Sequence, residues 1–231
     1  ITICVGDTVS LDANVNADDS TAFLQVINPP EGSFLAEGIR SDSLPLPDGT
    51  GASYETSISF TEFSPGQVLT DLNDLLSICV VMEHSYMRDL EIELTCPDGT
   101  TVTLHNFAGQ TGGEVFLGEP YELDEGFNPP IPGLGYEYCQ TPFDNNGFTC
   151  IEYANNFFPG TLPEGNYAAA DDLPALPGCP LNGEWTIRVQ DLWGIDNGYI
   201  FSWSINFNPD IYPDVETYQP NIIDWTWENS S

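Results

Sequence analysis

Apolar and polar residues alternate along residues 183–207, and this alternation predicts two β-strands. Every second position is apolar on either side of residues 191–198: Trp185, Ile187, Val189, Phe201, Trp203, Ile205 and Phe207. A period of two is typical of strands that bury one face. The intervening segment contains two glycines and an Asn-Gly step, which favour a sharp reversal of the chain. We therefore expect a β-hairpin with an acidic turn.

The two ends of the chain carry shorter alternating segments. Ile1, Ile3 and Val5 alternate before a Gly-Asp step, and residues 9–13 alternate after it. Residues 221–228, NIIDWTWE, have the composition of a strand at the other end. Helical periodicity is weak, and no apolar stretch approaches the roughly 18 residues of a membrane span. The pattern predicts an all-β protein without membrane insertion.

Acidic residues dominate the charge. The sequence has 36 Asp and Glu residues against three Arg and Lys residues, which gives a formal net charge of −33. This charge repels phosphate backbones and anionic membrane surfaces, so it excludes nucleic acid as a partner. Solubility at high ionic strength explains most of the carboxylates, and binding of divalent cations is the specific alternative for a few.

The cysteines lack the spacing of a zinc site, and their even number predicts three disulfides in an oxidising, extracellular compartment. They are Cys4, Cys79, Cys96, Cys139, Cys150 and Cys179. Sequence alone leaves about 15 connectivities open. A hairpin through residues 86–89 would set Cys79 beside Cys96. Cys139 and Cys150 bracket a short loop that they could close, which leaves Cys4 for Cys179 by elimination.

Two groups of motifs in residues 55–209 resemble the P domain of subtilisin-like proprotein convertases. The later group is NGEW (182–185), VQD (189–191), DNG (196–198) and SWSINF (202–207). The earlier group is His84, DLEIEL (89–94) and PDGT (97–100). EHSY (83–86) and FLGEP (116–120) make the segment similar to the version found in large secreted proteins of gliding-type Gram-negative bacteria. The resemblance implies a jelly-roll β-sandwich without a catalytic role of its own.

The flanking segments are similar to a different kind of module. ITICVGDT at the start resembles the opening strand of PKD-like or immunoglobulin-like modules, and residues 221–228 resemble a further strand of such a module. We therefore expect three regions: an N-terminal region, residues 1–54, with Ig/PKD-like strands and a loop; a P-domain-like jelly roll, residues 55–209; and a C-terminal strand or linker, residues 210–231.

No set of residues predicts catalysis. The two histidines are His84 and His105, and no nucleophile-elbow, zinc-protease or phosphate-loop motif occurs. Ser85, His84 and Asp89 could be imagined as a triad, but neighbours within one turn point in different directions. We expect the His84 ring to lie beside a core strand with its nitrogens hydrogen-bonded.

Calcium is the cofactor that the carboxylates favour, because it takes oxygen ligands in Gly-containing turns. The candidate ligands are Asp89, Glu119, Asp191 and Asp196. The P-domain resemblance supports this expectation, since some members hold calcium. The alternative is that Asp191 and Asp196 only cap the turn by accepting hydrogen bonds from backbone amides.

The sequence favours a non-catalytic structural or adhesive module of a secreted cell-surface or filament protein that acts by assembly. Neighbouring units would complete the terminal strands at Ile1, Ile3, Val5, Ile222, Ile223, Trp225 and Trp227. One alternative is an accessory P domain that stabilises a secreted subtilisin-like protease. Another is a carbohydrate-binding module with an aromatic platform drawn from Trp193, Tyr199, Trp225, Trp227, Tyr136 and Tyr138.

Overall fold

The computed structural model describes residues 12–17, 39–47, 52–109, 112–121, 131–142, 147–171, 173–213 and 222–228. The chain divides into two compact units: Pro30–Pro213, and a smaller one formed by Ile1–Pro29 with Asp214–Ser231. The larger unit contains two β-sheets, and the smaller unit contains a pair of strands. Among the described helices, none is long and apolar enough to cross a membrane.

One sheet of the larger unit has seven strands. They are β2 (Ile39–Pro45), β4 (Leu75–His84), β7 (Phe116–Leu117), β8 (Tyr136–Gln140), β9 (Thr161–Leu162), β10 (Gly165–Tyr167) and β12 (Gly198–Phe207). The main path runs β10-β8-β4-β12-β2, and β7 pairs with β4 and β9. Residues 39–45 fall in the N-terminal region expected from the sequence, but they form a strand that pairs with β12 at the edge of this sheet.

The other sheet has four strands in the order β3-β11-β5-β6. They are β3 (Tyr54–Phe60), β5 (Leu90–Thr95), β6 (Thr101–His105) and β11 (Gly183–Asp191). Every pair in this sheet is antiparallel. Its two central strands, β11 and β5, carry the alternating apolar residues that both motif groups supply.

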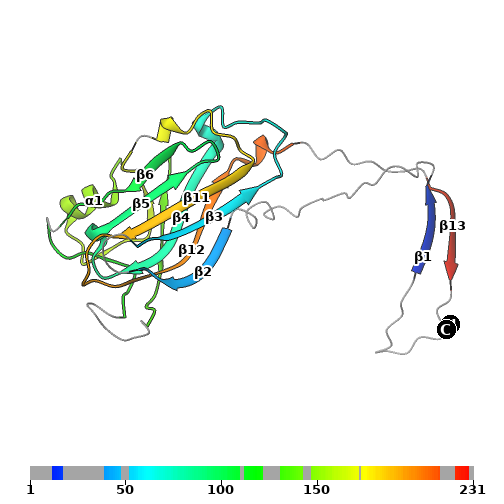
Figure 1. The fold of residues 1–231 in the computed structure, drawn as a ribbon. Coiled ribbons are helices and arrows are strands. Elements are labelled where there is room, and N and C mark those ends of the chain that lie inside the picture. Colours follow the sequence, from blue (N-terminus) through cyan, green and yellow to red (C-terminus); the bar gives the residue numbers. More distant parts are fainter. Residues whose placement is uncertain are drawn as a thin grey trace, which may run out of the picture. The chain divides into compact units, whose positions relative to one another are not determined.

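The hydrophobic core lies between the two sheets, which form a β-sandwich as predicted (Figure 1). Trp185, Ile187 and Val189 of β11 are completely buried, as the alternation of the sequence indicates. On β12 the expected alternation is interrupted, because the register shifts between Ile200 and Ser202. Ile200 therefore enters the core and Phe201 is only half-buried, whereas the remaining predicted positions of that strand are buried.

The predicted hairpins are wrong. β11 belongs to the four-stranded sheet and β12 to the seven-stranded sheet, so residues 192–197 cross from one sheet to the other. The same holds for β4 and β5, whose connection is residues 85–89. We call residues 85–89 the first arch and residues 192–197 the second arch. In each pair, both strands bury one face. Two such strands can face each other across the core of a sandwich or lie side by side in one sheet, so alternation alone does not distinguish an arch from a hairpin.

The disulfide pairing predicted from the hairpins is also wrong. Cys79 is bonded to Cys139, its directly opposite residue on the neighbouring strand β8. Cys96 is bonded to Cys179. Cys79 cannot reach Cys96 as proposed, because β4 and β5 lie in different sheets. The proposed Cys4–Cys179 bond is excluded by the Cys96–Cys179 bond, and Cys4 itself lies outside the described residues.

Cys150, the proposed partner of Cys139, is a buried free thiol in the first turn of helix α1 (Cys150–Phe157). Burial raises the pKa of this thiol to about 12. The helix was not expected from hydrophobic periodicity, but its start carries a recognisable signal. Thr149 and Glu152 form a reciprocal capping box in which each side chain accepts a hydrogen bond from the other residue's backbone N–H.

The smaller unit contains β1 (Asp12–Ala17) and β13 (Ile222–Glu228), which pair with each other in antiparallel fashion. The register sets Val15 opposite Trp225 and Ala13 opposite Trp227, so apolar pairs alternate with polar pairs such as Asn14 and Thr226. Of the predicted assembly residues, Ile222, Ile223, Trp225 and Trp227 lie in β13, while Ile1, Ile3 and Val5 lie outside the described residues.

Candidate metal centre

The two arches lie side by side because their flanking strands are paired. β4 pairs with β12, and β5 pairs with β11, so both chain segments change sheets at the same end of the sandwich. Backbone hydrogen bonds join them directly. Ser85 N–H donates to the carbonyl of Asn197 (2.9 Å), and Leu192 N–H donates to the carbonyl of Asp89 (2.9 Å). The sandwich topology, and not a hairpin turn, therefore brings the acidic residues of both motif groups together.

Three aspartates lie at or next to these arches: Asp89, Asp191 and Asp196, which we call the aspartate cluster. Asp89 and Asp191 are each 1% exposed, and Asp196 is half-buried. Asp191 accepts a hydrogen bond from Trp193 N–H through Oδ1 (3.0 Å), and its Oδ2 lies 3.1 Å from Nε2 of His84. Turn capping by Asp191 is thus present, but it accounts for only one of its carboxylate oxygens.

His84 is completely buried, and its ring has two fixed partners, as expected from the sequence. Its Nδ1 accepts a hydrogen bond from Tyr86 N–H (3.0 Å), so Nε2 carries the proton that faces Asp191. Ser85 Oγ donates to Asp196 Oδ1 (3.2 Å) and accepts from Asn197 N–H (3.0 Å). Ser85 therefore has partners other than the imidazole, and this geometry is not that of a serine nucleophile with its base.

Asp89 is the member of the cluster that its surroundings leave unsatisfied. Among the described residues, its Oδ1 is buried and has no hydrogen-bond partner. The carboxyl group of Asp196 lies close enough to raise the pKa of Asp89, and a proton or a cation would relieve the repulsion between the two groups. Burial, followed by the Asp196 and Asp191 carboxylates, raises the pKa of Asp89 to about 7. An orphaned carboxylate oxygen attracts a hard cation with oxygen ligands. The oxygens of the three aspartates do not all lie within 4.8 Å of one another, so a cation shared by all three would have to draw them closer.

Glu119 stands apart from the aspartate cluster. Its carboxylate accepts a hydrogen bond from the Tyr136 hydroxyl (2.7 Å), and its backbone pairs with that of Leu134. The supporting roles of Ser85 and Gly198 are not predicted from the sequence. A Cβ atom at Gly198 would overlap the His84 ring, so the Asn-Gly step that indicates a turn also leaves space for this histidine.

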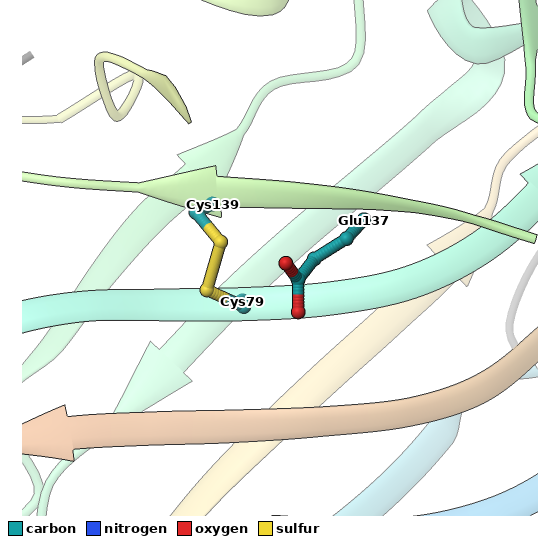
Figure 2. Close-up of side chains that lie close together, drawn as sticks. All are labelled: Cys79, Glu137 and Cys139. Carbon is teal, nitrogen blue, oxygen red and sulfur yellow. A yellow bond between two sulfur atoms is a disulfide. The ribbon is translucent and has the colours of Figure 1, made fainter. Parts of the chain in front are cut away.

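Two other groups of potential ligands surround the disulfides. Glu137 lies beside Cys79 and Cys139, and Figure 2 shows its carboxylate next to the bonded sulfurs. Asp98 lies in the same way beside Cys96 and Cys179. The sulfur atoms of each pair are bonded to one another, so neither group offers the thiolates that a soft metal ion requires. The aspartate cluster is the stronger candidate.

The aromatic residues considered for carbohydrate binding are scattered. Tyr138 is buried, where its hydroxyl donates to the Leu162 carbonyl and accepts from Gly118 N–H. Tyr199 is also buried and Tyr136 is half-buried, while Trp193 on the second arch is 38% exposed. The side chains of Trp225 and Trp227 lie outside the described residues. Carbohydrate binding stays a prediction.

Comparison with known families gives one match. Residues 75–129 match the family model of the proprotein convertase P-domain. The matched segment contains β4, the first arch with Asp89, and β5 to β7. No curated protein matches the chain. The β-sandwich and its two disulfides agree with such a domain and with an oxidising compartment. This part of the chain therefore resembles the proprotein convertase P-domain, a non-catalytic accessory domain of secreted proteins.

Proposed function

We propose that this chain is a calcium-stabilised, non-catalytic module of a secreted cell-surface or filament protein and that it acts through assembly with neighbouring units. The observation that carries the calcium part is the aspartate cluster, in which buried Asp89 has an oxygen without a hydrogen-bond partner among the described residues. The register of β1 and β13 supports the assembly part. The P-domain match supports the non-catalytic, accessory role.

Calcium at the aspartate cluster would act on stability. Asp89, Asp191 and Asp196 would supply carboxylate oxygens, and Ca²⁺ would neutralise charges that otherwise repel one another. Asp89 belongs to the first arch, whereas Asp191 immediately precedes the second arch and Asp196 lies within it. A cation shared by these residues would fasten the two arches and, through them, both sheets of the sandwich.

Assembly would act through the smaller unit. A two-stranded sheet is at best marginally stable in water, and within the described residues no further strand pairs with the outer edge of either strand. The register of β1 and β13 nevertheless sets apolar residues opposite each other at Ala13–Trp227 and Val15–Trp225. Strands from a neighbouring unit or domain would extend this sheet and cover its apolar residues.

The P-domain match also supports a second candidate function, that of an accessory domain that stabilises a secreted subtilisin-like protease. The two candidates differ in the other domains that the same polypeptide would contain. A serine-protease domain encoded in the same gene would favour the accessory role, whereas tandem β-sandwich modules would favour the surface or filament protein.

We expect the double substitution Trp225→Thr and Trp227→Thr in the full chain to weaken assembly. The change removes apolar area at two register positions, each worth about 2 kcal/mol when buried, but keeps residues with high strand propensity. Analytical ultracentrifugation over a concentration series measures the assembly, and near-UV circular dichroism checks that the sandwich stays folded.

Thr226→Ser is the matched control, because Thr226 lies between the two tryptophans and opposes the polar Asn14. This variant should assemble like the unchanged protein. Unchanged assembly of the Trp225→Thr, Trp227→Thr protein, or an unchanged protein that stays monomeric at every concentration, would contradict the proposed route of assembly.

A further inference from the structure

Helix α1 presents two aromatic side chains to solvent. Its inner side packs into the core through Cys150 and Ala154, which are 4% and 1% exposed. At its C-terminal end, Phe157 is 57% exposed and Phe158 is 81% exposed. The Phe157 ring still contacts Phe148 edge to face, with ring centroids 5.8 Å apart. Phe158 has no ring contact with any described residue, so its large apolar surface is not used within this part of the chain.

The backbone at Phe158 makes this exposure more unusual. Phe158 is the C-cap of α1 and adopts the left-handed conformation, with φ 49° and ψ 47°. It is the single non-glycine residue with positive φ among the described residues. Glycine or asparagine normally occupies such a position, because a bulky side chain is strained there. The chain therefore tolerates strain that holds an aromatic ring in water, without burial of the ring to offset it.

A pocket of about 430 Å³ adjoins the first turn of the same helix. Ile151 and Ala170 contribute apolar surface to it, and Glu91, Glu152 and Asp171 contribute three carboxylates. Among the described residues that line the pocket there is no Lys or Arg, although Arg188 pairs with Glu91 from outside the lining (3.4 Å). The surface of α1 thus combines an acidic pocket at one end with two exposed phenylalanines at the other, and we call this combination the α1 surface.

We infer that the α1 surface docks a basic segment of a partner protein, one that carries Lys or Arg residues together with apolar residues. Its cationic side chains would enter the acidic pocket, and its apolar residues would cover Phe157 and Phe158. The charge at the pocket favours this partner, because its carboxylates attract cationic side chains and repel an anionic membrane surface. This inference does not depend on calcium or on the terminal strands.

The probe for this inference is a synthetic peptide of leucine and lysine with a fluorescent label. Fluorescence anisotropy should show that it binds the full chain and that salt weakens the binding. Peptides with glutamate in place of lysine, or serine in place of leucine, should bind at least about tenfold more weakly. Phe157→Ser with Phe158→Gly should lower the affinity of the leucine–lysine peptide by about tenfold or more, equivalent to about 1.4 kcal/mol.

Phe158→Gly alone gives a second readout, because glycine relieves the backbone strain. It should raise the melting temperature of the protein by about 2–4 °C while it weakens peptide binding. Leu76→Ser is the matched control, since Leu76 is 44% exposed on β4 and should not affect binding. Equal binding by the phenylalanine variants, equal binding of the serine-substituted peptide, or self-association that depends on the two phenylalanines would overturn the inference.

Discussion

Replacing Trp185 with alanine is expected to destabilise the sandwich by about 3–5 kcal/mol. The Trp185 side chain is completely buried at the centre of the core. Its indole N–H donates to the Leu181 carbonyl (3.2 Å), and its ring packs edge to face on Phe207 at a centroid distance of 5.6 Å. Urea denaturation monitored by far-UV circular dichroism measures the change.

Trp193→Ala is the matched control for this substitution, because Trp193 is 38% exposed on the second arch. A substitution on the surface is expected to change stability by about 0.5 kcal/mol. Similar losses from the two tryptophan variants would show that Trp185 does not anchor the core between the sheets.

Replacing both Cys96 and Cys179 with alanine should cost about 2–5 kcal/mol of stability. The bond between them closes a loop across a sequence separation of 83 residues, which restricts the unfolded chain. Both residues are 2% exposed and belong to the hydrophobic core. The denaturation midpoint of the unreduced protein provides the measurement.

Cys150→Ala is the control for the packing of a buried cysteine, because Cys150 is equally enclosed but forms no disulfide. Its substitution should cost clearly less than the loss of the Cys96–Cys179 bond. Peptide mapping of the unreduced protein tests the disulfide pairing directly. A peptide in which Cys79 is joined to Cys96 would contradict it.

Alternation in the sequence predicts much of the β-structure, but it does not predict which strands pair. The spacing of Trp185, Ile187 and Val189 predicts which face of β11 is buried. It does not predict the partner of β11, because turn residues that reverse a hairpin reverse an arch equally well. Reading the 192–197 arch as a hairpin would place β12 beside β11 in one sheet, whereas the two strands lie in different sheets. Reading the 85–89 arch as a hairpin would pair Cys79 with Cys96, whereas Cys79 is bonded to Cys139.

Elsewhere too, local sequence signals predict single elements but not the contacts between distant parts of the chain. Helix α1 is too short for its periodicity to stand out, yet the Thr149–Glu152 capping box marks its start. The strand Ile39–Pro45 has few apolar residues, so its place beside β12 comes from backbone pairing that the sequence does not display. The meeting of Asp89 with Asp196 depends on stacked arches and therefore on the topology of both sheets.

The proposed binding of calcium to the aspartate cluster is expected to depend on pH, because Asp89 titrates. Its pKa is raised from 3.8 to about 7 in the folded protein, chiefly by burial and then by Asp196. Between these values the folded state holds a proton that the unfolded chain has lost. The stability of the calcium-free protein should therefore fall as pH rises from about 4 to 7 and then level off. Ca²⁺ competes with this proton, so its effect should grow as pH rises.

The most direct measurement compares melting temperatures with and without calcium near pH 5 and near pH 8, for the unchanged protein and for Asp89→Asn. Near pH 8, calcium at about 100 times its dissociation constant should add about 2.7 kcal/mol of stability to the unchanged protein. The gain should be much smaller near pH 5 and absent in Asp89→Asn, whereas Asp210→Asn, at an exposed position, should respond like the unchanged protein. No calcium effect near pH 8, or an equal effect in Asp89→Asn, would contradict a calcium site at the stacked arches.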